Sequence, residues 1–157
     1  MRIKGLIAFP VYLFITACTG NIDSSMKTIT CNPPQNPSKL SGKYSSKMTA
    51  ISEHGKKFGS STLDLKVDES GVITGTYAWE TSDGHGNDST GKKVQEDSEA
   101  VIGVFDSRDC EIGLAETNES GSFRGRLLPD GKIDLILIEP GEHPVAKLFS
   151  FERSPES

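Results

Sequence analysis

The segment LDLKVDESGVITGTY, residues 63–77, carries the pattern that decides the fold. In its first half Leu63, Leu65 and Val67 alternate with charged residues. Successive side chains of a strand point to opposite faces, so this alternation is typical of a half-buried strand. The residues Glu69-Ser70-Gly71 suit a turn, and the threonines and tyrosine after them suit a second strand. The segment therefore predicts two strands joined by a short connection.

The chain from Gly42 onward repeats this arrangement of strand and turn. Glycine and proline occur at nearly every junction, as in Pro129-Asp130-Gly131, and no segment shows a helical period. Short connections make consecutive strands antiparallel neighbours. Eight strands can close into a barrel whose interior holds packed side chains or one small ligand. We therefore predict an all-β, eight-stranded antiparallel up-and-down barrel, with a β-sandwich as the alternative. The predicted strands are 43–52, 62–68, 72–80, 99–106, 110–116, 122–128, 132–139 and 144–153.

Three segments resemble the first half of the avidin and streptavidin barrel. They are GKYSSKMTA at 42–50, LDLKVDESGVITGTY at 63–77 and IGVFDS at 102–107. The resemblance covers about half of the domain and implies a barrel; the glycine-x-aromatic opening is also similar to that of lipocalins and small periplasmic inhibitors.

The resemblance does not extend to the biotin site of that family. Tyr77 matches a tyrosine that bonds the ureido oxygen, but Ser46 and Ala50 stand where the family has asparagine and serine. Most of the family's aromatic box is also missing, and a site built to hydrogen-bond a ligand loses affinity heavily when partners are absent. Biotin is therefore not the expected ligand.

Residues 1–17, MRIKGLIAFPVYLFITA, have the layout of a secretory signal peptide. Arg2 and Lys4 precede an apolar run that is shorter than the ~20 residues a membrane-spanning helix needs. Ile15-Thr16-Ala17-Cys18 resembles the bacterial lipobox, which implies cleavage after Ala17 and fatty acylation of Cys18. Thr19, rather than aspartate, follows the cysteine, which in Gram-negative lipoproteins favours the outer membrane.

The other two cysteines, Cys31 and Cys110, would then lie in an oxidising compartment, and we expect them to form a disulfide bond. Residues 19–41 are polar, and Pro33, Pro34 and Pro37 argue against a helix or a central strand. The predicted organisation is a signal peptide at 1–17, an acylated tether at 18–41 and a β-barrel domain at 42–157.

Charge and motif content narrow the possible activities. The net charge of −5 would become −7 without the signal peptide, which argues against a nucleic-acid partner and against spreading of the protein surface on anionic lipid, so we expect the lipid anchor to provide the membrane binding. The three histidines are far apart, and the sequence has no common hydrolase or phosphate-binding motif. We therefore expect no enzymatic activity, no cofactor and no metal site.

The long segment 82–98, SDGHGNDSTGKKVQEDS, joins two predicted strands and favours either a solvated loop or a loop that contacts a partner. We expect a lipoprotein of the outer membrane, facing the periplasm, with a non-enzymatic binding domain for an envelope protein, as in inhibitor or immunity proteins, or for a small ligand. The alternative is a structural accessory lipoprotein of an envelope assembly. A hydrolase whose motif is not recognised is a less favoured alternative. The candidate contact residues are Tyr44, Met48, Tyr77, Trp79 and His85.

Overall fold

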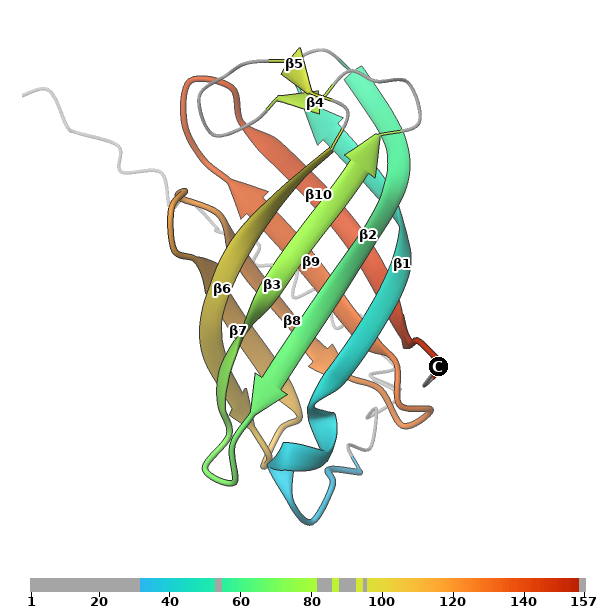
Figure 1. Ribbon diagram of the computed structural model, residues 1–157, viewed down its shortest axis with the longest axis vertical. Helices are drawn as coiled ribbons and strands as arrows, with labels where there is room; N and C mark the ends of the chain where they lie inside the picture. Colours follow the sequence, from blue (N-terminus) through green and yellow to red (C-terminus); the bar gives the residue numbers. More distant parts are fainter. Residues whose placement is uncertain (1–31, 53–54, 82–85, 88–92, 95, 156–157) are drawn as a thin grey trace, which may run out of the picture.

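A computed structural model of the chain describes residues 32–52, 55–81, 86–87, 93–94 and 96–155. Eight antiparallel strands close into a barrel (Figure 1). Barrel strands that follow one another in the sequence pair with each other, and the last strand pairs with the first. The predicted up-and-down barrel is therefore confirmed, and the β-sandwich alternative is excluded.

The order around the barrel is β1-β10-β9-β8-β7-β6-β3-β2, and β4 and β5 form a separate two-stranded sheet between β3 and β6. We call the end of the barrel at the β2–β3, β6–β7 and β8–β9 turns the closed end, and the opposite end the mouth. The strands are β1 (Gly42–Ser52), β2 (Gly55–Val67), β3 (Val72–Thr81), β4 (Gly86–Asn87), β5 (Lys93–Val94), β6 (Glu96–Asp106), β7 (Glu111–Glu116), β8 (Ser122–Leu127), β9 (Ile133–Glu139) and β10 (Val145–Arg153).

Most strand bounds agree with the prediction, but β2 begins at Gly55 rather than at Thr62. The residues 55–61 lack an apolar alternation, yet they pair with β1 in unbroken register from Gly55 opposite Ser52. Backbone pairing needs no particular side chain, so the neighbouring strand extends β2 where the sequence pattern does not.

A short 3-10 helix, η1 (Pro37–Leu40), precedes the barrel, so the prediction of no helix in this segment is wrong. Proline is tolerated in the first turn of a helix because the N–H that it lacks would have no partner there. The Asn36 side chain caps the helix by accepting a hydrogen bond of 2.9 Å from the Ser38 backbone N–H. The described residues contain no helix that is long and apolar enough to cross a membrane.

The closed end is sealed by η1 and the last residue of β10. Leu40 is buried, and its carbonyl accepts a 2.8 Å hydrogen bond from the Tyr44 hydroxyl. The Arg153 guanidinium donates to the Lys39 and Ser41 carbonyls and to the Tyr44 hydroxyl at 2.6, 2.9 and 2.9 Å. The packing of the barrel therefore begins before Gly42, inside the predicted tether.

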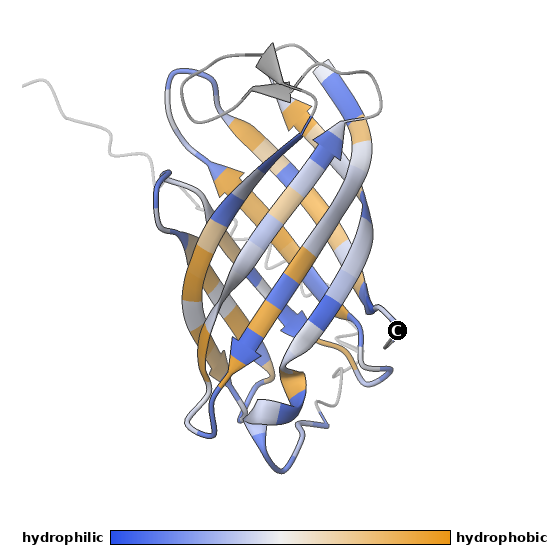
Figure 2. Cartoon of the chain, viewed as in Figure 1, coloured by the Kyte–Doolittle hydropathy of each residue, from blue (hydrophilic) through white to orange (hydrophobic). Residues whose placement is uncertain are grey.

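Aromatic side chains fill the middle of the barrel. Tyr77 meets Phe123 and Phe149 edge-on with ring centroids 4.9 and 5.7 Å apart, and Phe149 stacks on Phe151 at 5.1 Å. All four side chains are at most 2% exposed. Figure 2 shows the alternation of hydrophobic and hydrophilic residues along the strands that turns these rings inward. Protein side chains thus occupy the space that an apolar ligand would need.

Candidate functional site

The interior changes from apolar to charged near the mouth. Glu99, Glu116 and Lys147 lie at inward positions of β6, β7 and β10, and each is at most 8% exposed. Glu139 ends β9 beside them and is 20% exposed in its side chain. Ionised groups are rarely buried unless they are paired, so this ring of charges above the aromatic core is the candidate functional site.

Lys147 is the cation of this site. Its Nζ donates to Glu139 Oε1 at 2.7 Å. The same Nζ lies 5.0 Å from the centroid of the Trp79 ring and 5.7 Å from that of Tyr77, which are cation–π distances. The ammonium group is therefore held by one carboxylate and two aromatic faces.

Among the carboxylates of this site, Glu116 has the fewest interactions to compensate for its burial. A Cβ at Gly121 would clash with its carboxyl group, so the glycine of the β7–β8 turn makes room for it. Burial, together with the charges of Glu139 and Glu119, raises the pKa of Glu116 from 4.5 to about 7. Its Oε2 is buried and accepts no hydrogen bond from any described residue. Glu116 is therefore only partly ionised near neutral pH, and its Oε2 is an acceptor that one more donor would satisfy.

Glu119, in the turn above Glu116, extends the negative charge toward solvent. Burial raises its pKa, and the nearby charges of Glu99 and Glu139 raise it further. The Asn118 amide lies 3.5 Å from Glu99 Oε2, at the limit of a hydrogen bond. Four carboxyl groups thus surround one ammonium group at the mouth.

Two hydroxyl groups below the carboxylates are also poorly satisfied. The Tyr77 hydroxyl and the Ser61 Oγ are buried and form no well-aligned hydrogen bond with any described residue, although the two hydroxyl groups lie close enough to interact; the residues are 0% and 2% exposed. Burial raises the pKa of Tyr77 well above 10, the Ser61 hydroxyl lowers it in part, and the charges of Glu139 and Glu116 raise it, so the Tyr77 hydroxyl stays protonated and faces a negative field. Buried polar groups without partners are uncommon in native proteins.

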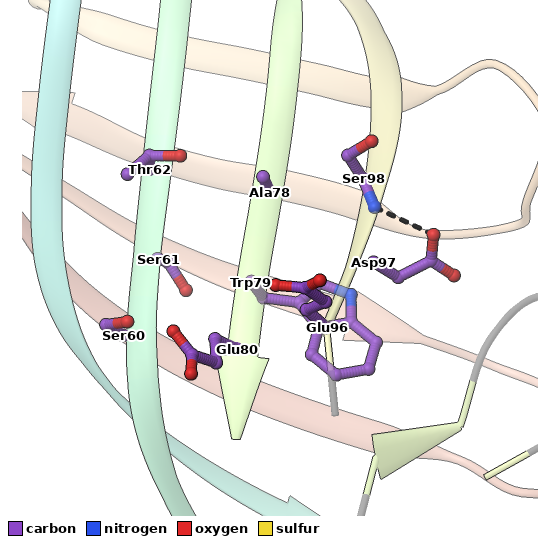
Figure 3. A pocket seen from close by; sticks show the side chains of 9 residues that line it. All are labelled: Ser60, Ser61, Thr62, Ala78, Trp79, Glu80, Glu96, Asp97 and Ser98. Carbon is purple, nitrogen blue, oxygen red and sulfur yellow. Dashed lines mark hydrogen bonds between the residues drawn. The ribbon is translucent and has the colours of Figure 1, made fainter. Parts of the chain in front are cut away.

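A shallow groove of about 430 Å³ runs over the outer side of β2, β3 and β6 near the mouth (Figure 3). Its acidic residues are Glu80, Glu96 and Asp97, and none of the described residues that line it is basic. Trp79 belongs to this groove and also contacts Lys147 inside the barrel. Near the Trp79 end of β3, the barrel is therefore acidic both in its interior and on its outer surface.

The candidate contact residues fall into separate places. Met48, Tyr77 and Trp79 lie in the interior, and the Trp79 ring contacts Lys147 of the charged site. Tyr44 lies at the closed end, where it bonds η1. His85 lies outside the described residues.

The predicted lipidation site and disulfide bond are not tested by the structure. Cys18 and Cys31 are outside the described residues, and Cys110 is buried at the closed end. Both predictions therefore remain predictions.

Sequence reasoning did not find the glutamates and Lys147 as a group. One signal was available: Lys147, Phe149 and Phe151 share the spacing of two that places them on one face of β10. A lysine in register with buried aromatics predicts a charge inside the barrel. The sequence could not show which carboxylates from three other strands would meet it.

The arrangement suits a hydrogen-bond donor that carries positive charge. No group of three or more histidine, cysteine, aspartate or glutamate residues in the described part of the chain could hold a metal ion. Comparisons with protein-family models, with curated proteins and with solved structures found no match. The site is therefore interpreted from its geometry alone.

Proposed function

We propose that this chain is a lipid-anchored, non-enzymatic binding protein that takes a cationic group of its ligand or partner at the mouth of the barrel. The observation that carries the proposal is a set of three buried polar atoms, Ser61 Oγ, Tyr77 OH and Glu116 Oε2, that form no well-aligned hydrogen bond with any described residue and lie next to a surplus of carboxylates. An ammonium or guanidinium group supplies both the donors and the charge that these atoms lack.

The electrostatics of the mouth supports a cationic rather than an anionic or apolar ligand. Among the described side chains, Lys147 is the cation near four carboxyl groups, and the groove outside Trp79 is acidic as well. An anion would meet repulsion here, and an apolar ligand would leave the unpaired groups unpaired. Trp79 offers an aromatic face of the kind that cations prefer.

The test uses Trp79, the single tryptophan of the chain, as the reporter. The full-length protein in detergent is titrated at pH 8 with n-butylammonium and n-butylguanidinium, and with 1-butanol as the neutral control. We expect a saturable change in tryptophan emission with the cations and none with butanol.

Two variants assign the change to the site. Glu116→Gln removes the charge with little change of shape, and a hydrogen bond to a charged group is worth about 1.5–3 kcal/mol. The cation affinity should therefore fall roughly tenfold or more. Glu111→Gln, on the same strand but half-exposed, is the matched control and should leave the affinity unchanged. Equal titrations in both variants, or an effect that sodium chloride reproduces, would contradict the proposal.

The lipid anchor is the second part of the proposal, supported by the lipobox at Cys18. Acyl chains on one cysteine give stable attachment because each buried methylene contributes ~0.8 kcal/mol. Thr19, rather than aspartate, after Cys18 favours the outer membrane, and we place the domain on its periplasmic side as part of the same proposal. The intact mass of the membrane fraction should show the fatty acyl groups, and Cys18→Ser should abolish them. A chain of unmodified mass that still fractionates with membranes would refute this part.

We also propose a disulfide bond between Cys31 and Cys110 as a covalent cross-link at the closed end, where Cys110 is buried. Closure of so long a loop would stabilise the fold by a few kcal/mol. Alkylation followed by mass measurement, with and without reductant, should show two thiols only after reduction.

A further inference from the structure

Five of the eight large hydrophobic side chains that are exposed in the described part of the chain lie on one wall of the barrel; the other three, Val72, Ile102 and Val104, lie on β3 and β6. The backbone ladder places Phe58, Thr49, Leu148, Ile136 and Arg124 in one row across β2, β1, β10, β9 and β8. The next row toward the mouth runs Lys56, Ile51, Ala146, Ile138 and Ser122 over the same strands. We call these two rows the apolar wall.

The apolar side chains of this wall are well exposed. Ile51, Phe58, Ile136, Ile138 and Leu148 are 60%, 55%, 50%, 48% and 61% exposed. Single exposed hydrophobic residues are normal on protein surfaces, but five in two adjacent rows form a contiguous patch of the kind that marks an interaction site.

The charges of the wall have one sign. Its two ionic residues are Lys56 and Arg124, at opposite edges, and its two rows contain no aspartate or glutamate. Arg124 also lies 3.6 Å from Glu111 of the adjoining strand β7, but its side chain is 83% exposed. The chain as a whole has 22 acidic and 17 basic residues, so a wall without any acidic residue is a departure from its average. The Lys56 Nζ lies 5.0 Å from the Phe58 ring centroid, which places one positive charge directly at the apolar surface.

We propose that the apolar wall rests on an anionic lipid surface. Aliphatic and aromatic side chains enter the acyl boundary, while Lys56 and Arg124 meet lipid phosphates at the two edges. Charge complementarity favours a lipid surface as the partner. Anionic headgroups can pair with the basic residues at the edges of the wall, and the acyl chains below them can contact its apolar side chains. The proposal goes beyond the cation site at the mouth and does not depend on it.

The tether allows this orientation. If Cys18 is acylated, as proposed above, the number of residues from there to Asn32 limits the reach of the anchor to about 45–50 Å. A strand of 11 residues such as β1 measures about 36 Å along its axis. The anchored barrel can therefore lie on its side with the wall against the bilayer. This orientation rests on the proposed anchor, whereas the lipid affinity of the wall does not.

The test places a tryptophan on the wall and measures its depth. The full-length chain carries Trp79→Phe together with Leu148→Trp, and is reconstituted with vesicles of phosphatidylglycerol and brominated phosphatidylcholine, whose bromines quench tryptophan. The matched control is Val104→Trp in the same background. Val104 is an exposed apolar residue, 59% exposed, on β6 at the opposite side of the barrel.

We expect the tryptophan of Leu148→Trp to be quenched at least threefold more than that of Val104→Trp. The neutral variants Lys56→Gln and Arg124→Gln should together reduce the quenching by half or more, as should the omission of phosphatidylglycerol. Equal quenching at both positions would overturn the proposal, because the anchor alone would then explain the contact. If the Leu148 probe stays unquenched and a photo-crosslinker at Leu148 captures an envelope protein, the wall is a protein interface and the lipid proposal is wrong.

Discussion

The variant Glu116→Gln tests the electrostatics of the mouth most directly. The pKa of Glu116 rises from 4.5 to about 7 because the group is buried and lies near Glu139 and Glu119. A carboxyl group whose pKa is raised in the folded state stabilises the fold when it is protonated. This contribution is fully present below pH 4.5 and is lost as the pH rises through 7.

The magnitude follows from the shift. At 1.36 kcal/mol per pKa unit, the rise from 4.5 to about 7 corresponds to about 3 kcal/mol of stability lost between these pH values. Glutamine resembles the protonated acid in shape and charge. The variant should therefore match the parent at pH 4 and exceed it in the free energy of unfolding by up to about 3 kcal/mol at pH 8.

The assay is urea denaturation of the full-length protein and the variant at several pH values from 4 to 8. The difference between the two free energies of unfolding is the relevant quantity, because the other titrating groups largely cancel in it. Glu111→Gln, on the same strand, serves as the control and should show no pH-dependent difference. A difference for Glu116→Gln that stays constant over this range would refute the reasoning, since it would show that Glu116 titrates as it does in the unfolded chain.

Three further variants test other parts of the barrel by the same denaturation assay. Tyr77→Phe removes a buried hydroxyl that has no well-aligned hydrogen bond with any described residue, so the free energy of unfolding should rise by about 1 kcal/mol, and a loss would show that the contact with the Ser61 hydroxyl is a stabilising hydrogen bond. Phe149→Ala opens a cavity in the aromatic core and should cost about 3–5 kcal/mol; a cost below 1 kcal/mol would argue against tight packing. Arg153→Gln removes three donated hydrogen bonds at the closed end and should cost about 1 kcal/mol, with faster amide exchange at Lys39; unchanged exchange would show that η1 does not depend on it.

Together the proposals assign different faces of one barrel to different partners. The mouth is acidic inside and along the groove beside Trp79, while the apolar wall carries only positive charges. The two surfaces adjoin each other, because the mouth-side row of the wall includes Ile138, which directly precedes Glu139 at the mouth. We therefore expect the wall, and not the like-charged mouth, to contact anionic lipid.

The sequence by itself determined the elements and the class of fold. The alternation of Leu63, Leu65 and Val67, the turn at 69–71 and the scarcity of helical periodicity predict short antiparallel strands, because side chains of a strand alternate between core and solvent. Their number and short connections also predict the order in which the strands pair. Tyr77 and Trp79 were identified as interior or mouth residues for the same reason.

Only the tertiary structure decided what the strands bring together. Glu99, Glu116, Glu139 and Lys147 come from four strands, and their meeting depends on the register of each pairing. A shift of one residue in any strand would turn its charge outward. The apolar wall arises in the same way, since Phe58 and Leu148 are distant in sequence and become neighbours only through their common partner Thr49. Local sequence patterns determine which face a residue takes, but closure of the barrel determines its neighbours, and electrostatic interactions depend on those neighbours.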